Sequence, residues 1–197
     1  MSVQVAGECA IKNNGEKPEG YDFSDMLYMV KNWDYGTLGY LIKDIDGNGT
    51  DELIFGGNAE ASTTWYDGII YDIYTISDGE LVHVLDGWER NRYFLCENGV
   101  IANEGSGSAF DGTNSYFTLK GAELQLIESV IWHQDQWGND IYYYTTESEH
   151  DTENAEIISK EQSDAIKGEY VYEHTTFIPF DSRYSNKRFV GPPFPVF

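Results

Sequence analysis

The chain has 197 residues, with 34 acidic side chains against 12 basic ones, which gives a formal net charge of −22 at pH 7. This acidic excess excludes a nucleic-acid-binding protein that neutralises phosphates. No apolar run approaches the roughly 20 residues that a membrane-spanning helix needs. Because 41% of the residues are hydrophobic and 15% are aromatic, we expect a folded core rather than a disordered chain.

Three segments are expected along the chain. Residues 1–20 have no signal-peptide pattern and become polar and Gly/Pro-containing, which predicts a flexible N-terminal tail. Residues 21–180 are expected to form a single β-rich domain, and residues 181–197, with their Pro-rich end, predict an extended C-terminal tail. The protein is therefore either secreted or at the cell surface, with an export signal outside these residues, or cytoplasmic.

Two helices are predicted, one near each end of the domain. Asp22 is a candidate N-cap for the first, whose apolar positions follow helical spacing: Phe23, Met26, Leu27 and Val30. Ser159 is a candidate N-cap for the second, with Gln162 three residues later as in a capping box. The second helix is expected to end near Gly168.

Between the two helices the sequence predicts strands. Residues 39–43 and 52–55 are the first candidates, and later apolar and aromatic runs are joined by turns that contain glycine. The predicted hairpins pair 69–76 with 81–85, 93–96 with 100–101, 116–119 with 124–132, and 124–132 with 141–145. The chain is too short for a closed propeller. We expect a mainly β fold, an antiparallel meander of hairpins that forms a curved sheet, a sandwich or a partial barrel.

The sequence also supports predictions for the Gly/Ser-rich segment 103–115 and for Cys96. Residues 103–115 are rich in Gly and Ser, which predicts a flexible connector between hairpins. Cys96 is the last residue of the strand-like run 92–96 and is expected to be a small core residue. Whether it pairs with Cys9, the other cysteine, is left open by the sequence.

The most informative motif is the acidic run from Asp44 to Glu52, which holds four acids in nine residues. Acids held this close repel one another unless a cation neutralises them. Ligand groups stand at alternate positions of the run: the side-chain oxygens of Asp44, Asp46 and Asn48, the carbonyl of Thr50 and the carboxylate of Glu52. An all-oxygen ligand set suits calcium and argues against zinc. The alternative is an empty, solvated acidic turn.

This spacing resembles the short calcium loops of FG-GAP and VCBS-type repeats. Their pattern, D-x-[DN]-x-[DN]-G-x-x-[DE]-L, is matched by Asp44, Asp46, Asn48, Gly49, Glu52 and Leu53. The helix–loop–helix calcium motif does not fit, because Phe55 stands at its twelfth position. The resemblance covers residues 40–57 in a single copy, so it implies a structural calcium site and not a propeller.

The wider sequence, with its tyrosine-rich hairpins, also resembles a group of uncharacterised secreted or lipid-anchored proteins of Gram-positive gut bacteria. That resemblance implies an extracytoplasmic setting and no particular activity. The expected role is binding or scaffolding at the cell surface, with a glycan or a protein as partner.

The alternative function is a carbohydrate-binding module or a glycoside-active enzyme. Trp132 and Trp137 stand among amides and acids, as in aromatic sugar-binding platforms, and nearby carboxylates could act on a glycosidic bond. The competing interpretation is a core tryptophan beside a polar hairpin turn. No catalytic residue is assigned, because any pair drawn from 34 acids carries little information.

Overall fold

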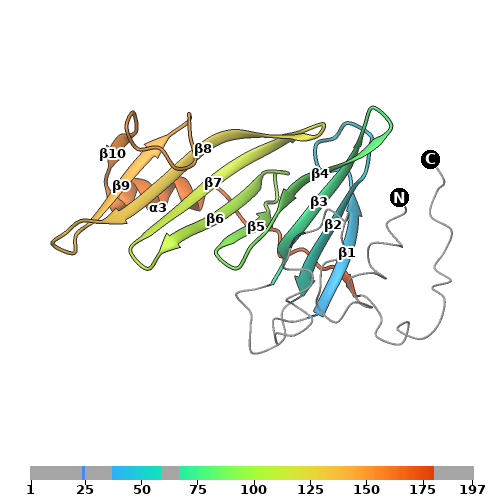
Figure 1. The fold of residues 1–197 in the computed structure, drawn as a ribbon, viewed down its shortest axis with the longest axis horizontal. Coiled ribbons are helices and arrows are strands. Elements are labelled where there is room, and N and C mark those ends of the chain that lie inside the picture. Colours follow the sequence, from blue (N-terminus) through green and yellow to red (C-terminus); the bar gives the residue numbers. More distant parts are fainter. Residues whose placement is uncertain (1–23, 25–36, 59–66, 180–197) are drawn as a thin grey trace.

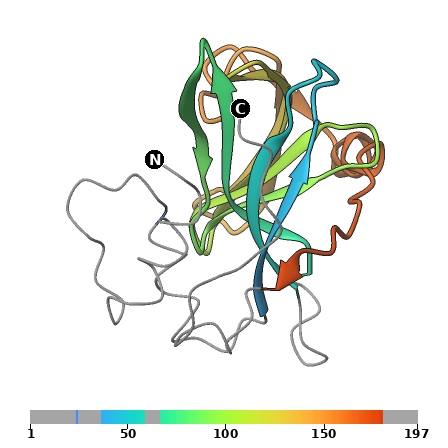
Figure 2. The same cartoon turned by 90° about the vertical axis from the view of Figure 1, so that its right-hand side faces the viewer.

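The computed structural model describes Ser24, residues 37–58 and residues 67–179. Within these residues the chain forms one antiparallel sheet of 11 strands and one α-helix (Figure 1). The strand order is β10-β9-β8-β7-β6-β5-β3-β2-β1-β11, with β4 paired to β3 outside this path. The sheet is open and strongly curved (Figure 2). The predicted mainly β meander is thus confirmed, and its arrangement is the curved sheet.

The elements have the following bounds. The strands are β1 (Thr37–Lys43), β2 (Glu52–Asn58), β3 (Ile69–Ser77), β4 (Glu80–Asp86), β5 (Asn91–Leu95), β6 (Ile101–Ser108), β7 (Asp111–Lys120), β8 (Glu123–Gln134), β9 (Asp140–Thr145), β10 (Glu156–Ile158) and β11 (Ile178–Pro179), and the helix is α3 (Lys160–Gly168).

The four predicted hairpins are confirmed. Antiparallel pairing joins β3 to β4, β5 to β6, β7 to β8, and β8 to β9. Their turns place Gly79, Gly99, Gly121 and Gly138 at φ values of 80°, 76°, 59° and 86°. Glycine reaches this left-handed region without a steric penalty, so the turn glycines fix where each strand reverses.

The prediction of a flexible connector at residues 103–115 is wrong, because these residues form most of β6 and the first half of β7. Their low β propensity is overridden by packing across the sheet. Ser115 and Ser129 are fully buried cross-strand partners, and the Ser129 hydroxyl donates to Ser115 Oγ at 2.8 Å. Gly112 has no room for a Cβ because the indole of Trp132 lies over it. Small residues therefore serve close packing in these strands.

The predicted C-terminal helix is confirmed as α3, with both hydrogen bonds of the capping box between Ser159 and Gln162. The helix predicted after Asp22 lies outside the described residues apart from Ser24, which is not helical, so an N-terminal helix is not supported. The predicted tails also fall outside the described residues.

Residues 169–177, which we call the C-terminal strap, run from α3 to β11 at the far side of the sheet (Figures 1 and 2). Tyr170 stacks on Tyr116 with ring centroids 3.5 Å apart, and Tyr172 stacks on Phe94 at 4.7 Å. Phe177 is fully buried. The strap therefore packs against the sheet through aromatic rings along its length.

Among the described residues, buried hydrophobic side chains form two clusters. The larger one contains Ile45, Ile54, Ile70, Ile73, Leu85, Tyr93, Leu95, Ile101, Phe117, Leu119 and Phe177. The smaller one contains Cys96, whose free thiol is buried as expected, and burial raises its pKa to about 11. Ile45 belongs to the acidic run, so this run is anchored directly in the core.

Candidate metal centre

The acidic loop is the connection between two paired strands. Lys43 at the end of β1 faces Glu52 at the start of β2, so residues 44–51 must reverse the chain within a short span. Gly47 and Gly49 make this possible, with φ values of 72° and 88°. Both glycines thus have the positive φ angles that side-chain-bearing residues rarely adopt.

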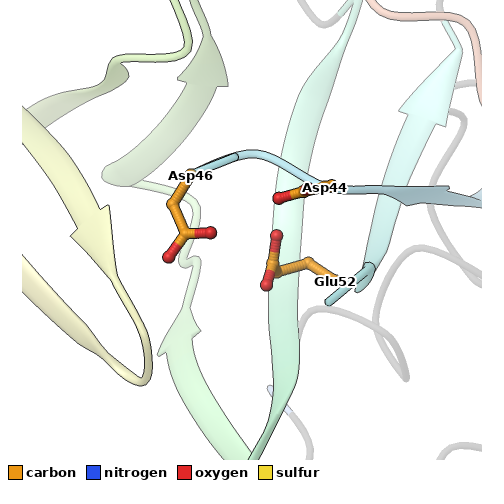
Figure 3. Close-up of side chains that lie close together, drawn as sticks. All are labelled: Asp44, Asp46 and Glu52. Carbon is orange, nitrogen blue, oxygen red and sulfur yellow. The ribbon is translucent and has the colours of Figure 1, made fainter. Parts of the chain in front are cut away.

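The turn brings three carboxylates together. Asp44, Asp46 and Glu52 each offer an oxygen, and these oxygens lie within 4.8 Å of one another. Figure 3 shows the carboxylates of Asp44 and Glu52 facing each other, with that of Asp46 to one side, further along the loop from Asp44. This group could hold a metal ion.

Backbone hydrogen bonds fix the two aspartates. The carboxylate of Asp44 accepts the N–H groups of Gly47, Asn48 and Gly49 at 2.8–3.1 Å. Asp46 accepts the backbone and side-chain N–H groups of Asn48 and the N–H of Gly121 in the β7–β8 turn. The loop is therefore wrapped around one carboxylate and tied to a distant hairpin by the other.

Glu52 is the buried member of the group, with 0% of its surface exposed. Its Oε2 accepts the N–H of Ile45 and its Oε1 accepts the hydroxyl of Thr75. Burial raises the pKa of this carboxyl above its usual 4.5, the Ile45 and Thr75 hydrogen bonds oppose the rise, and the neighbouring Asp46 and Asp44 add to it. The ionised form is therefore costly here without a further positive partner.

The group retains capacity to bind a cation. A carboxylate offers about four acceptor positions, whereas Asp44 and Asp46 each accept three hydrogen bonds and Glu52 accepts two. The ion pairs found among the described residues place no Lys or Arg against these three acids. Oxygen atoms facing one another without a basic partner are the arrangement that a hard divalent cation stabilises.

The other two predicted ligands have structural contacts of their own. The amide oxygen of Asn48 accepts the N–H of Thr50 at 2.7 Å, and its amide nitrogen donates to Asp46. Both residues therefore shape the loop in this structure. Their role as ligands stays a prediction.

The two predicted ligand-binding tryptophans have different environments. Trp132 is half-buried in β8 and packs over Gly112, as expected for a residue with a packing role. Trp137 is 77% exposed in the β8–β9 turn. Asp135 accepts the N–H groups of Trp137 and Asn139 and thereby holds this turn.

Sequence reasoning missed a second buried carboxylate, Asp72 in β3. It accepts hydrogen bonds from the backbone and hydroxyl of Ser24, and its Oδ1 lies 2.8 Å from Nε2 of His83. Burial raises the pKa of Asp72, and the bonds with His83 and Ser24 oppose that rise. The sequence did contain a signal for this site, because Asp72 is an acid within the apolar run 69–76. A charge buried in a strand requires partners.

Comparison with protein-family models, with curated proteins and with solved structures found no match. The resemblance of the acidic loop to known calcium loops therefore depends on the loop residues themselves. In the described part of the chain, no helix combines the length and apolar character needed to span a membrane.

Proposed function

We propose that this protein is an extracytoplasmic β domain in which a structural calcium ion binds to Asp44, Asp46 and Glu52. The ion would join the β1–β2 loop to the core through Glu52 and to the β7–β8 turn through Asp46. The domain itself would serve binding or scaffolding at the cell surface.

The observation that carries the calcium proposal is the buried carboxylate of Glu52, which faces two further carboxylates. A divalent cation would compensate the desolvation and the mutual repulsion that raise its pKa. Calcium fits because every available donor is oxygen and because its flexible coordination tolerates an irregular loop. A weak site would also be occupied outside the cell, where extracellular modules bind calcium with dissociation constants of about 10⁻⁴–10⁻³ M.

The test is thermal unfolding with EDTA, with millimolar calcium and with millimolar magnesium, together with calcium titration calorimetry. Calcium should raise the melting temperature of the wild-type protein, because a ligand that binds only the folded state stabilises it. Asp44→Ala should abolish that rise. Asp51→Ala is the matched control, since Asp51 is an exposed acid of the same loop outside the group of three.

Two results would overturn the calcium proposal. One is an unchanged melting temperature and no binding heat at millimolar calcium. The other is an equal loss of the calcium effect in Asp44→Ala and Asp51→Ala, which would indicate general charge screening rather than coordination.

The second candidate function is a carbohydrate-binding module, favoured by the exposure of Trp137. The enzymatic form of this alternative has less support. Hydrogen bonds from Asn139 and the backbone of its turn lower the pKa of the nearby Asp135, whereas a general acid needs a raised one.

A further inference from the structure

Three turns at one end of the sheet each present an exposed aromatic ring. Trp88 lies in the β4–β5 connection, Phe110 in the β6–β7 turn and Trp137 in the β8–β9 turn, with 45%, 62% and 77% of their surfaces exposed. Because the strands are antiparallel, these turns follow one another along the same end of the sheet (Figure 1). We call these three residues the aromatic rim.

Backbone hydrogen bonds join the three turns. The N–H of Ser106 in β6 donates to the carbonyl of Arg90 at 2.9 Å, which ties the β6–β7 hairpin to the β4–β5 connection. The N–H of Gln134 donates to the carbonyl of Phe110 at 2.8 Å, which ties the same hairpin to the β8–β9 turn. The three rings are therefore carried on one connected backbone.

Two of the turns share a further device that holds their shape. Asp111 accepts the N–H groups of Gly107 and Ser108 and the hydroxyl of Ser108. Asp135 accepts the N–H groups of Trp137 and Asn139 and the side-chain amide of Asn139. These bonds, led by the side chains of Ser108 and Asn139, lower the pKa of both carboxyls, so both are ionised at neutral pH.

Exposed aromatic rings on fixed turns are suited to ligand binding, because little side-chain or loop entropy is lost when a ligand contacts them. Most of the surface of Phe110 and Trp137 is exposed, so packing in the core does not explain the presence of these two rings. The turns between the rings are polar, with Ser, Asn, Gln and Asp side chains. The rim therefore alternates apolar faces with hydrogen-bonding groups.

We propose that the aromatic rim is the binding site for an extended, neutral polysaccharide. Sugar rings combine an apolar face, which stacks on aromatic side chains, with hydroxyl groups, which bond to amides and carboxylates. Neighbouring strands lie about 4.8 Å apart, so the β6–β7 and β8–β9 turns are roughly 10 Å apart. A linear polysaccharide laid along the turns would meet these rings at alternate sugar units.

Charge and layout favour this ligand over the alternatives. A net charge of −22 repels nucleic acids, acidic glycans and anionic membranes. A protein partner is best matched by a continuous apolar centre within an interface of about 1,000 Å² or more. The rim instead offers separate rings in a row.

The proposal specifies the ligand for the binding role proposed above, and it depends on that role but not on calcium. The acidic loop lies beside the β7–β8 turn, at the opposite end of the sheet from the rim (Figure 1). The rim turns are also held by Asp111 and Asp135 rather than by the acidic loop. The two proposals can therefore fail separately.

The experiment is native gel electrophoresis of the full chain in gels that contain a neutral polysaccharide. The probes are soluble cellulose-type β-glucan, xylan, mannan and starch, with hyaluronate as the acidic comparison. At least one neutral probe should retard the wild-type protein. Trp137→Ala and Phe110→Ala should each weaken that retardation about tenfold or more. Leu81→Ala is the matched control, because Leu81 is exposed at the β3–β4 turn, away from the rim.

Calcium-dependent melting and analytical ultracentrifugation of the same variants complete the test. The rim variants should keep the wild-type melting behaviour, because the rings are exposed, and the same oligomeric state. The proposal is overturned if no neutral probe retards the protein, if a variant that combines Trp137→Ala with Phe110→Ala binds as well as the wild type, or if hyaluronate binds equally. It is also overturned if the rim variants dissociate an oligomer, which would make the rim a self-association surface.

Discussion

The carboxylate of Asp46 accepts the backbone N–H of Gly121 at 2.9 Å, across 75 residues of sequence. This bond connects the acidic loop to the turn between β7 and β8. The same loop buries Ile45 in the main core. Binding of a cation to the three carboxylates would therefore be coupled to a remote hairpin and to the core.

The Asp46–Gly121 bond should be detectable by amide hydrogen exchange. Asp46→Ala removes the acceptor, so the Gly121 N–H should exchange faster, and the free energy of unfolding should fall by about 0.5–1.5 kcal/mol. Calcium should slow this exchange in the wild-type protein. Asp51→Ala is the control and should leave Gly121 unchanged; equal exchange in the wild type and Asp46→Ala would contradict the prediction.

Glu52 should make the metal-free protein less stable at neutral pH. Its folded-state pKa lies above its usual 4.5, so the folded state binds this proton more readily than the unfolded state. The cost is present above the folded pKa and disappears as the pH falls through it toward 4.5. Glu52→Gln should therefore raise the melting temperature in EDTA at pH 7, while it removes the calcium response.

The measurement is a series of denaturant unfolding curves between pH 7 and pH 4.5 in EDTA. The stability gap between Glu52→Gln and the wild type should shrink as the pH falls. Other carboxyls titrate in both proteins, so the difference isolates Glu52. Glu80→Gln, at an exposed residue of β4, is the control. A gap that is constant with pH would contradict the raised pKa.

Local sequence signals predicted the hairpins and α3 well. The glycine turns and the Ser159 capping box act within a few residues, so the chain reveals them directly. The β6–β7 hairpin was missed because burial of Ser115 against Ser129 depends on strand pairing that propensity does not record.

The acidic loop was predicted for the same local reason, since its ligand spacing lies within nine residues. The burial of Glu52 and the bond from Gly121 to Asp46 were not predictable, because both depend on contacts with distant strands. The sequence predicted only part of the aromatic rim. Trp137 was a candidate ligand-binding residue because its neighbours are polar. Phe110 lay in a segment predicted to be a flexible connector.

The capping box of α3 should contribute measurable stability. Ser159→Ala removes the hydroxyl that accepts the N–H of Gln162, which should cost about 1 kcal/mol. Ser159→Asp should retain most of that stability, because aspartate is an equally good N-cap. Urea unfolding distinguishes these outcomes, and equal stability of all three proteins would show that the cap is dispensable.

Phe177 should be the main anchor of the C-terminal strap. It is fully buried, its backbone exchanges two hydrogen bonds with the Asn58 side chain, and its ring occupies the space where Gly56 lacks a Cβ. Phe177→Ala should cost about 3–5 kcal/mol of unfolding free energy. Ile178→Ala, at the exposed next residue, should cost far less.

A double-mutant cycle tests whether Gly56 and Phe177 act as a pair. Gly56→Ala alone should destabilise the protein by about 1–3 kcal/mol, because the added methyl group overlaps the Phe177 ring. In the Phe177→Ala background the same methyl group fills part of the vacated space, so its cost should shrink or reverse. Additive effects in denaturant unfolding would mean that packing of the Phe177 ring does not depend on the absence of a side chain at residue 56. The strap would then be held mainly through the pairing of β11, which follows it, to β1.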